Sequence, residues 1–394
     1  MNETIYMPVG EVCSSISDTY REKKNLVTLI NTSDVLEGRV LNHERVPNSN
    51  LKGQFKKTFQ RDDILYSEIR PQNRRFAYVD FSPIDYIAST KLMVIRAKKD
   101  VVSPKYLYYF LKNSSTVAEL QLLAETRSGT FPQITFSEVA NLTIPVPPLA
   151  VQEVIVQTMQ CLEDKTICNE QINDNLEQQA QAIYHERFET VSPNDLPSDW
   201  RIVTLGEVAT ISNKSFNPLK EPKILLEHYS IPAFDEARFP VFELSTSIKS
   251  NKFIIDASCF MISKLNPTTK RVWKPYCLTG NAVCSTEFIV YKAKDQSITD
   301  FLYSVIDSGS FSDFMCSHVT GSTGSRQRTT PSDTLSYELI LPSEDELAEF
   351  QSLVSPMYAQ MRINAIENDK LKRLRDSLLP KLMSGEIDVS SVHL

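Results

Sequence analysis

Two basic clusters beside proline turns are the residues of this chain whose types and spacing suggest chemistry most clearly. The first follows Ile69 and includes Pro71, and the second follows 196 residues later around Pro267. Arginine and lysine bind phosphate oxygens, and these contacts fix the position of a protein on a duplex. The duplicated clusters therefore predict nucleic-acid contacts at these residues: Arg70, Arg74 and Arg75 in the first cluster, and Lys264, Lys270 and Arg271 in the second.

Two loops rich in small residues could read bases. Their segments are Arg127-Ser128-Gly129-Thr130 and Thr323-Gly324-Ser325-Arg326-Gln327-Arg328. Arginine pairs with guanine and glutamine with adenine through planar donor groups, so both loops are candidate base readers. Further phosphate contacts are expected from exposed lysines: Lys52, Lys56, Lys57, Lys249 and Lys252. The competing interpretation of each of these cations is an ordinary solvated surface residue.

Catalytic motifs are absent from the sequence. There is no phosphate-binding Gly-rich loop, no nucleophile elbow and no paired-histidine zinc motif, and the five histidines are isolated. The seven cysteines contain no C-x-x-C pair, which argues against a zinc site or a disulfide framework. We therefore expect no catalytic residues, no metal site and no cofactor in this chain.

Charge and hydropathy limit the possible locations and partners. The net charge of -7 argues against a protein that is basic throughout, but the basic residues are concentrated in the two regions named above. No apolar run is long enough to span a bilayer and no secretory leader is recognisable, so we expect a cytoplasmic protein.

An internal repeat organises the chain. Gly10-Glu11-Val12 recurs as Gly206-Glu207-Val208, and Ser89-Thr90 recurs as Ser285-Thr286, both 196 residues later. An offset that persists over half the sequence indicates duplication. We predict two α+β domains at residues 1–148 and 191–342, a spacer helix at 149–190, and a C-terminal helix with its tail at 343–394.

The two long helices carry matching seams. Apolar residues alternate at steps of four and three from Ile155 to Ile183, and again 195 residues later from Phe350 to Leu378. This spacing is typical of a coiled coil, in which a buried Asn costs stability but fixes register. We expect antiparallel pairing that relates the two domains by a pseudo-two-fold axis. The register would be set by Asn169, Asn173, Asn364 and Asn368.

Three segments resemble one known family. Pro197-Ser198-Asp199-Trp200-Arg201-Ile202-Val203-Thr204-Leu205-Gly206-Glu207-Val208 resembles the start of a target-recognition domain in the DNA specificity (S) subunit of Type I restriction-modification systems. Thr143-Ile144-Pro145-Val146-Pro147-Pro148-Leu149 resembles the entry to that family's spacer helix. The segment from Leu371 to Glu386 resembles its C-terminal end.

The resemblance implies a non-catalytic DNA reader. Each domain would recognise one half of a bipartite double-stranded DNA sequence, and the helices would set the gap between the halves. Two methyltransferase (M) subunits and the restriction (R) subunits would be the partners, and they would hold S-adenosylmethionine, ATP and magnesium. The alternative is a coiled-coil scaffold that carries two protein-interaction domains, which predicts weak, sequence-independent DNA affinity.

Overall fold

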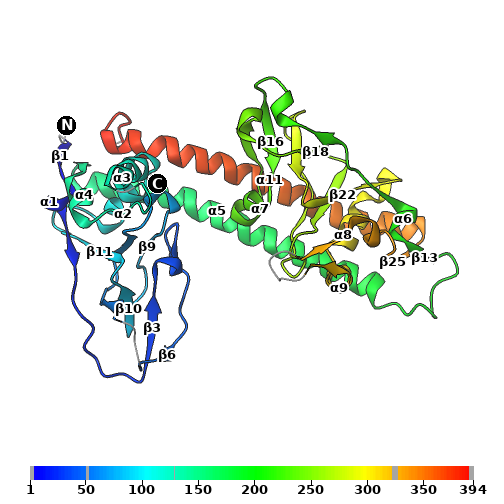
Figure 1. Cartoon of the computed structure of the whole chain (residues 1–394), viewed down its shortest axis with the longest axis horizontal. Coiled ribbons are helices and arrows are strands. Elements are labelled where there is room, and N and C mark those ends of the chain that lie inside the picture. Colours follow the sequence, from blue (N-terminus) through cyan, green and yellow to red (C-terminus); the bar gives the residue numbers. More distant parts are fainter. Residues whose placement is uncertain (1–3, 50–52, 128, 322–326, 390–394) are drawn as a thin grey trace. The chain divides into compact units, whose positions relative to one another are not determined.

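The structure is a computed structural model that describes residues 4–49, 53–127, 129–321 and 327–389. The chain forms two compact units (Figure 1). Unit 1 comprises Met1–Lys165 together with Lys370–Leu394, and unit 2 comprises Thr166–Asp369. Each unit therefore contains one globular domain and a part of each long helix. No helix in the described ranges is long and apolar enough to cross a membrane.

Unit 1 contains two four-stranded sheets. The first sheet has the order β2-β11-β8-β9, and the second has the order β6-β3-β10-β7. The first sheet consists of β2 (Cys13–Ile16), β11 (Leu92–Ala97), β8 (Ile64–Ser67) and β9 (Phe76–Tyr78). The second consists of β6 (Val46–Pro47), β3 (Leu26–Ile30), β10 (Tyr86–Ser89) and β7 (Phe55–Lys57). Of these pairs only β3 and β10 are parallel.

The remaining elements of unit 1 are short strands and helices. A terminal strand pair joins β1 (Ile5–Pro8) to β12 (Thr143–Val146), and a small hairpin joins β4 (Val35–Leu36) to β5 (Arg39–Val40). The helices are α1 (Val9–Val12), α2 (Pro104–Lys112), α3 (Ser114–Arg127) and α4 (Phe136–Asn141), with 3₁₀ turns η1 (Thr32–Asp34) and η2 (Pro71–Asn73).

Unit 2 repeats this plan. Its first sheet has the order β14-β22-β19-β20, and its second has the order β15-β18-β21-β16-β17. The first sheet consists of β14 (Ala209–Ile211), β22 (Phe288–Ala293), β19 (Cys259–Ser263) and β20 (Val272–Trp273). The second consists of β15 (Ser215–Phe216), β18 (Lys252–Ile254), β21 (Ala282–Ser285), β16 (Leu225–Tyr229) and β17 (Val241–Leu244).

Unit 2 also has a terminal strand pair and short helices, as unit 1 has. The terminal pair is β13 (Arg201–Thr204) with β25 (Glu338–Leu341), and β23 (Val319–Thr320) pairs with β24 (Arg328–Thr329). The helices are α6 (Leu205–Val208), α7 (Ile231–Ala237), α8 (Thr299–Ile306), α9 (Gly309–Ser317) and α10 (Pro331–Thr334). Three 3₁₀ turns are η4 (Pro218–Lys220), η5 (Ser245–Ser247) and η6 (Gln296–Ile298).

Each unit has three layers: the short helices, the first sheet and the second sheet. The central strand of the first sheet contacts both of its neighbouring layers. Successive side chains of a strand point to opposite faces. In β11, Met93 and Ile95 pack against the helices, while Leu92 and Val94 pack against the second sheet. In β22, residues 289, 291 and 293 likewise face the helices, while 288 and 290 face the second-sheet side. A nearly continuous apolar strand is needed because both of its faces are buried.

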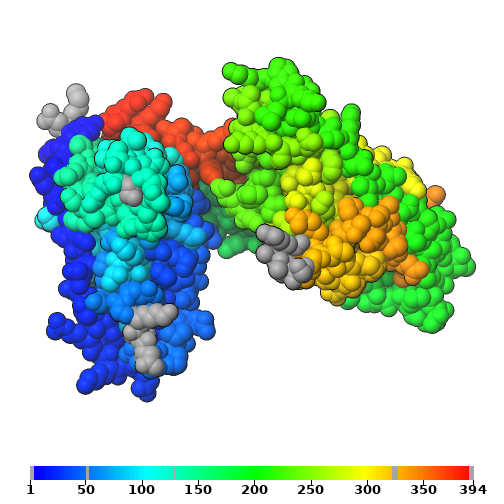
Figure 2. Space-filling view, in the orientation of Figure 1, coloured from blue at the N-terminus to red at the C-terminus, as the bar shows by residue number. Residues whose placement is uncertain are grey.

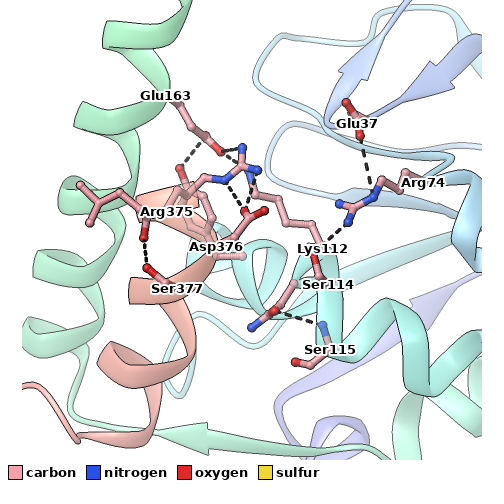
Figure 3. Close-up of polar contacts among 12 residues, drawn as sticks. Glu37, Arg74, Lys112, Ser114, Ser115, Glu163, Arg375, Asp376 and Ser377 are labelled. Carbon is pink, nitrogen blue, oxygen red and sulfur yellow. Dashed lines mark hydrogen bonds and ion pairs between the residues drawn. The ribbon is translucent and has the colours of Figure 1, made fainter. Parts of the chain in front are cut away.

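The two long helices are α5 (Leu149–Tyr184), which continues as a π-helical turn at His185–Glu189, and α11 (Glu344–Ser384). Within unit 2 their contacts run antiparallel, because Asn169 bonds to Asn368 whereas Asn173, further along α5, bonds to Asn364. The expected α+β class with two long antiparallel helices is confirmed. Within unit 1, Glu163 of α5 forms ion pairs with Arg375 of α11 and with Lys112 of α2 (Figure 3).

Asparagines occupy the middle of the helix seam within unit 2. The Nδ2 atom of Asn364 donates to Oδ1 of Asn173 at 2.8 Å. The Nδ2 atom of Asn169 donates to Oδ1 of Asn368 at 2.8 Å and to Oε2 of Glu367 at 2.7 Å. Asn169 is fully buried and Asn364 is 4% exposed. If one helix slid past the other, these buried amides would lose their hydrogen-bond partners. The asparagines therefore favour a single register of the helix pair.

Candidate nucleic-acid interface

The two kinds of loop that the sequence singled out lie side by side in unit 1. The residue pair 69 and 133 forms an isolated antiparallel bridge, which joins the proline-turn cluster to the loop that follows α3. The β10–β11 turn and the loop before β7 lie next to them. The connecting main-chain bonds run from Thr90 N to Gln54 O (2.7 Å), from Glu68 N to Lys91 O (3.0 Å), from Ile134 N to Glu68 O (2.9 Å), and from Arg70 N to Pro132 O (3.1 Å).

Unit 2 assembles the same four segments in the same way. Leu265 and Arg328 form the equivalent isolated bridge. The connecting contacts are the strand pair Lys252–Ser285, and main-chain bonds from Lys264 N to Glu287 O (2.9 Å), Asn266 N to Gln327 O (2.9 Å) and Thr329 N to Lys264 O (3.1 Å). We call these segments the four-loop face: residues 53–57, 68–75, 89–91 and 129–134 in unit 1, and 249–252, 264–271, 285–287 and 327–328 in unit 2.

Left-handed backbone occurs at the same position of both faces. Arg70 has φ 44° and Asn266 has φ 53°, and each precedes a proline. This conformation is uncommon for a non-glycine residue and costs about 1–3 kcal/mol, so it persists only where its surroundings hold it in place. The main-chain bonds to Pro132 and Gln327 supply that support. Arg70 is exposed and has no ionic partner among the described residues, so its guanidinium is available to a ligand.

The charges of one pair of residues at the centre of the face are exchanged between the units. In unit 1, Lys91 lies 3.3 Å from Glu68. At the matching positions unit 2 has Glu287 and Lys264, and these retain the main-chain bond. Glu287 accepts two bonds from Arg328, at 2.9 and 3.1 Å, and this pairing raises the pKa of the Arg328 guanidinium. The sequence analysis missed this pairing; comparing residues at the 196-residue offset would have shown only the exchange of charges between Glu68 and Lys91 and their counterparts.

Several predicted contact residues are engaged within the chain. Arg74 donates to Ser114 at 2.8 Å and lies 3.8 Å from Glu37 (Figure 3). The other engaged residues are Arg75 with the main chain of Ser33 (2.9 Å), Arg127 with Glu138 (2.6 Å), Arg271 with Asp235 (2.5 and 2.9 Å), and Lys270 with Asp307 (2.8 Å). Because these side chains already have partners within the chain, DNA contact through them stays a prediction, and it would require them to exchange those partners for DNA.

Lys57 and Lys252 point into the protein, which corrects the expectation that both present their ammonium groups to phosphate. Lys57 Nζ donates to the main-chain oxygens of Thr90 and Leu92 at 3.1 and 2.8 Å. Lys252 is 5% exposed and donates to Ser250. Burial lowers the pKa of both side chains. Alternation along β7 explains the difference between Lys57 and its exposed neighbour Lys56.

The remaining predicted residues divide into two groups. In the described part of the chain, no side-chain partner is seen for Lys56, Arg70, Lys249 or Lys264, and Thr130 is exposed. Gln327 contributes its main-chain oxygen to the face. Five predicted residues lie outside the described ranges: Lys52, Ser128, Thr323, Ser325 and Arg326. The structure adds Phe131, which is 48% exposed on the four-loop face of unit 1 and which the charge-based search passed over.

The fold and the doubled face define a class of protein in which one α+β domain is duplicated and each copy is attached to a pair of long helices. Comparison with known proteins identifies the family. Residues 5–178 match the family described as Type I restriction modification DNA specificity domain. This part of the chain therefore carries the DNA specificity domain of Type I restriction-modification systems, and the chain as a whole is similar to specificity subunits of those systems.

Individual relatives support this assignment. The Type I restriction enzyme HindI specificity subunit of Haemophilus influenzae is 29% identical, over 92% of this chain and 94% of that protein. The MjaIX specificity subunit of Methanocaldococcus jannaschii is 24% identical, over 79% and 77%.

Solved structures share the fold. The Type I restriction-modification S subunit from M. genitalium aligns with a TM-score of 0.53 at 15% identity, covering 97% of this chain and 96% of that one. A chain from a study of assembly and conformational transition in a type I R-M system aligns with a TM-score of 0.52 at 19% identity, covering 98% of both.

Proposed function

We propose that each unit reads one half of a bipartite DNA target through its four-loop face, and that the paired helices fix the gap between the halves. The observation that carries the proposal is the recurrence of the same four segments, held by equivalent main-chain contacts, in both units. Two copies of one reading surface match a target with two separate recognition elements. Arg70, Lys264 and Phe131 are the residues whose side chains are best placed to contact DNA.

The chain acts without catalysis of its own in this proposal. It works in the cytoplasm as the specificity subunit of a complex with two methyltransferase subunits and with restriction subunits. S-adenosylmethionine, ATP and Mg²⁺ belong to those partners. The role of the chain is to determine which base pairs are brought to the methyltransferase active sites.

Methylome sequencing tests the proposal directly. The chain is expressed together with its neighbouring methyltransferase subunit in a host that lacks other modification systems, and modified positions are mapped across the genome. The expected result is one split motif with a constant gap. Absence of any modified motif, with the complex intact by size-exclusion chromatography, would contradict the proposal and favour the scaffold alternative.

A single substitution tests the assignment of the face. Arg70→Ala is expected to relax recognition in one half of the motif and leave the other half unchanged, because the change lies in unit 1 alone. Lys99→Ala is the matched control, since Lys99 is an exposed cation of the same unit that pairs with Asp62 at 2.6 Å. Unaltered discrimination in both halves after Arg70→Ala would remove that residue from the reading surface.

A further inference from the structure

We propose that a second surface in each unit, distinct from the four-loop face, binds the phosphate backbone of duplex DNA. This inference rests on the proposed function and extends it to residues that the sequence analysis did not select. We call the surface the cationic edge. It consists of Arg21, Lys23 and Lys24 in unit 1, and of Lys214, Lys220 and Lys223 in unit 2.

In unit 1 the cationic edge borders strand β7. One side of β7 pairs with β10, and the segment before β3 pairs with its other side. Tyr20 N donates to Lys56 O at 2.8 Å, and Thr58 N donates to Asp18 O at 2.8 Å. The main chain of Lys24 is fixed further along, because Asn48 Nδ2 donates to its oxygen at 2.9 Å. The cations at residues 21–24 therefore lie on an ordered segment beside Lys56.

In unit 2 the equivalent segment borders strand β18. Ile254 N donates to Lys214 O at 2.9 Å, and β15 continues the pairing. The following residues are fixed to η5 through Ser245, whose hydroxyl donates to Pro222 O at 3.0 Å and whose amide donates to Ile224 O at 2.9 Å. This places Lys220 and Lys223 on the η5 side of the sheet, where the chain leads to Lys249. Figure 2 shows that these early parts of each repeat, blue in unit 1 and green in unit 2, make up much of the visible surface of their units.

The charge of this edge is uncompensated. All six side chains are exposed, and none forms an ion pair among the residues that the structure describes. Residues 21–24 and 214–223 each contain three cations and one carboxylate, Glu22 or Glu221. The net charge of the chain is -7, and other cations of these domains, such as Lys99 and Lys292, are paired with carboxylates. Two unpaired clusters in corresponding segments suit an extended polyanion, because Lys and Arg side chains make sequence-independent contacts with the phosphates of DNA.

Lysines on a sheet edge have a second use, which is to prevent edge-to-edge pairing with another chain. The two roles make different predictions. Protection against pairing predicts aggregation when the charges are removed and no change in the salt dependence of DNA binding. Phosphate contact predicts a smaller salt dependence and an unchanged association state.

The test uses the full chain in complex with its methyltransferase subunits, and a mixed-sequence duplex as the probe. The edge variant carries Lys23→Gln, Lys24→Gln, Lys220→Gln and Lys223→Gln. The control variant carries Lys98→Gln, Lys99→Gln, Lys292→Gln and Lys294→Gln, which removes the same charge from cations already bonded within the chain. Affinity is measured by fluorescence anisotropy over a range of salt concentrations.

Each phosphate contact contributes about 0.9 to the slope of log affinity against log salt, so loss of four contacts lowers its magnitude by about 3.6 relative to the control. A slope equal to that of the control overturns the proposal. So does a variant that aggregates, or one that fails to retain its methyltransferase subunits, since either result assigns the edge to another role. These outcomes leave the split motif of the unmodified complex in place, so they are separate from failure of the proposed function.

Discussion

The pair formed by Asn173 and Asn364 provides a quantitative test of how the helix seam works. Asn173→Leu removes the acceptor of Asn364 Nδ2, which belongs to a residue that is only 4% exposed. Leaving a buried donor unsatisfied costs about 1–3 kcal/mol. For a domain of this size, a loss of about 2 kcal/mol lowers Tm by roughly 4–8 °C.

The double variant distinguishes register from simple stability. When Asn173→Leu and Asn364→Leu are combined, neither partner is left unsatisfied, and replacement of both groups by apolar side chains is close to neutral. The expected coupling is therefore about 1–2 kcal/mol in favour of the double variant. The partner of Asn364 on its own helix, Gln360, is exposed and can bond to water instead.

The assay is thermal and urea denaturation of the four chains in the double-mutant cycle. A functional measurement follows from the same reasoning: with the polar pair removed, helix register is less tightly specified, so the mapped motif should show more than one gap length. Additive destabilisation in the double variant, or a single variant as stable as the parent, would refute the argument that these asparagines satisfy one another.

Three further outcomes are expected. Arg70→Gly should raise the stability of unit 1 by about 1 kcal/mol, since glycine adopts positive φ without strain, while recognition of one half-site weakens; a loss of stability in denaturation would contradict this. Burial raises the pKa of Asp307 to about 6, although Lys270 opposes the shift. The folded chain therefore binds this proton more tightly than the unfolded chain does. Stability should therefore fall as pH rises from about 4 to about 6 and then level off, and Asp307→Asn should flatten this dependence in pH-dependent unfolding. Insertion of four residues into each long helix adds about 5.4 Å and should lengthen the preferred gap by about one or two base pairs; an unaltered gap in the mapped motif would show that the helices do not set it.

The sequence by itself determined the architecture of this protein to a large extent. The near-constant 196-residue offset indicated duplication, and the four-three seam indicated two long helices with asparagines facing one another. These features depend on local periodicity, which survives in a linear sequence because hydrophobic spacing matches the geometry of the element that it forms. The proline turns likewise marked where the chain changes direction.

Only the tertiary structure decided which cations face outward. Lys56 and Lys57 are adjacent and chemically identical, yet one is exposed and the other donates to Thr90 and Leu92. The partner that occupies Arg328, Glu287, lies 41 residues away along the chain and becomes its neighbour through sheet pairing. Ionic pairing between distant segments leaves no periodic signal, so the sequence could locate basic clusters but could not separate ligand-facing groups from those that hold the fold.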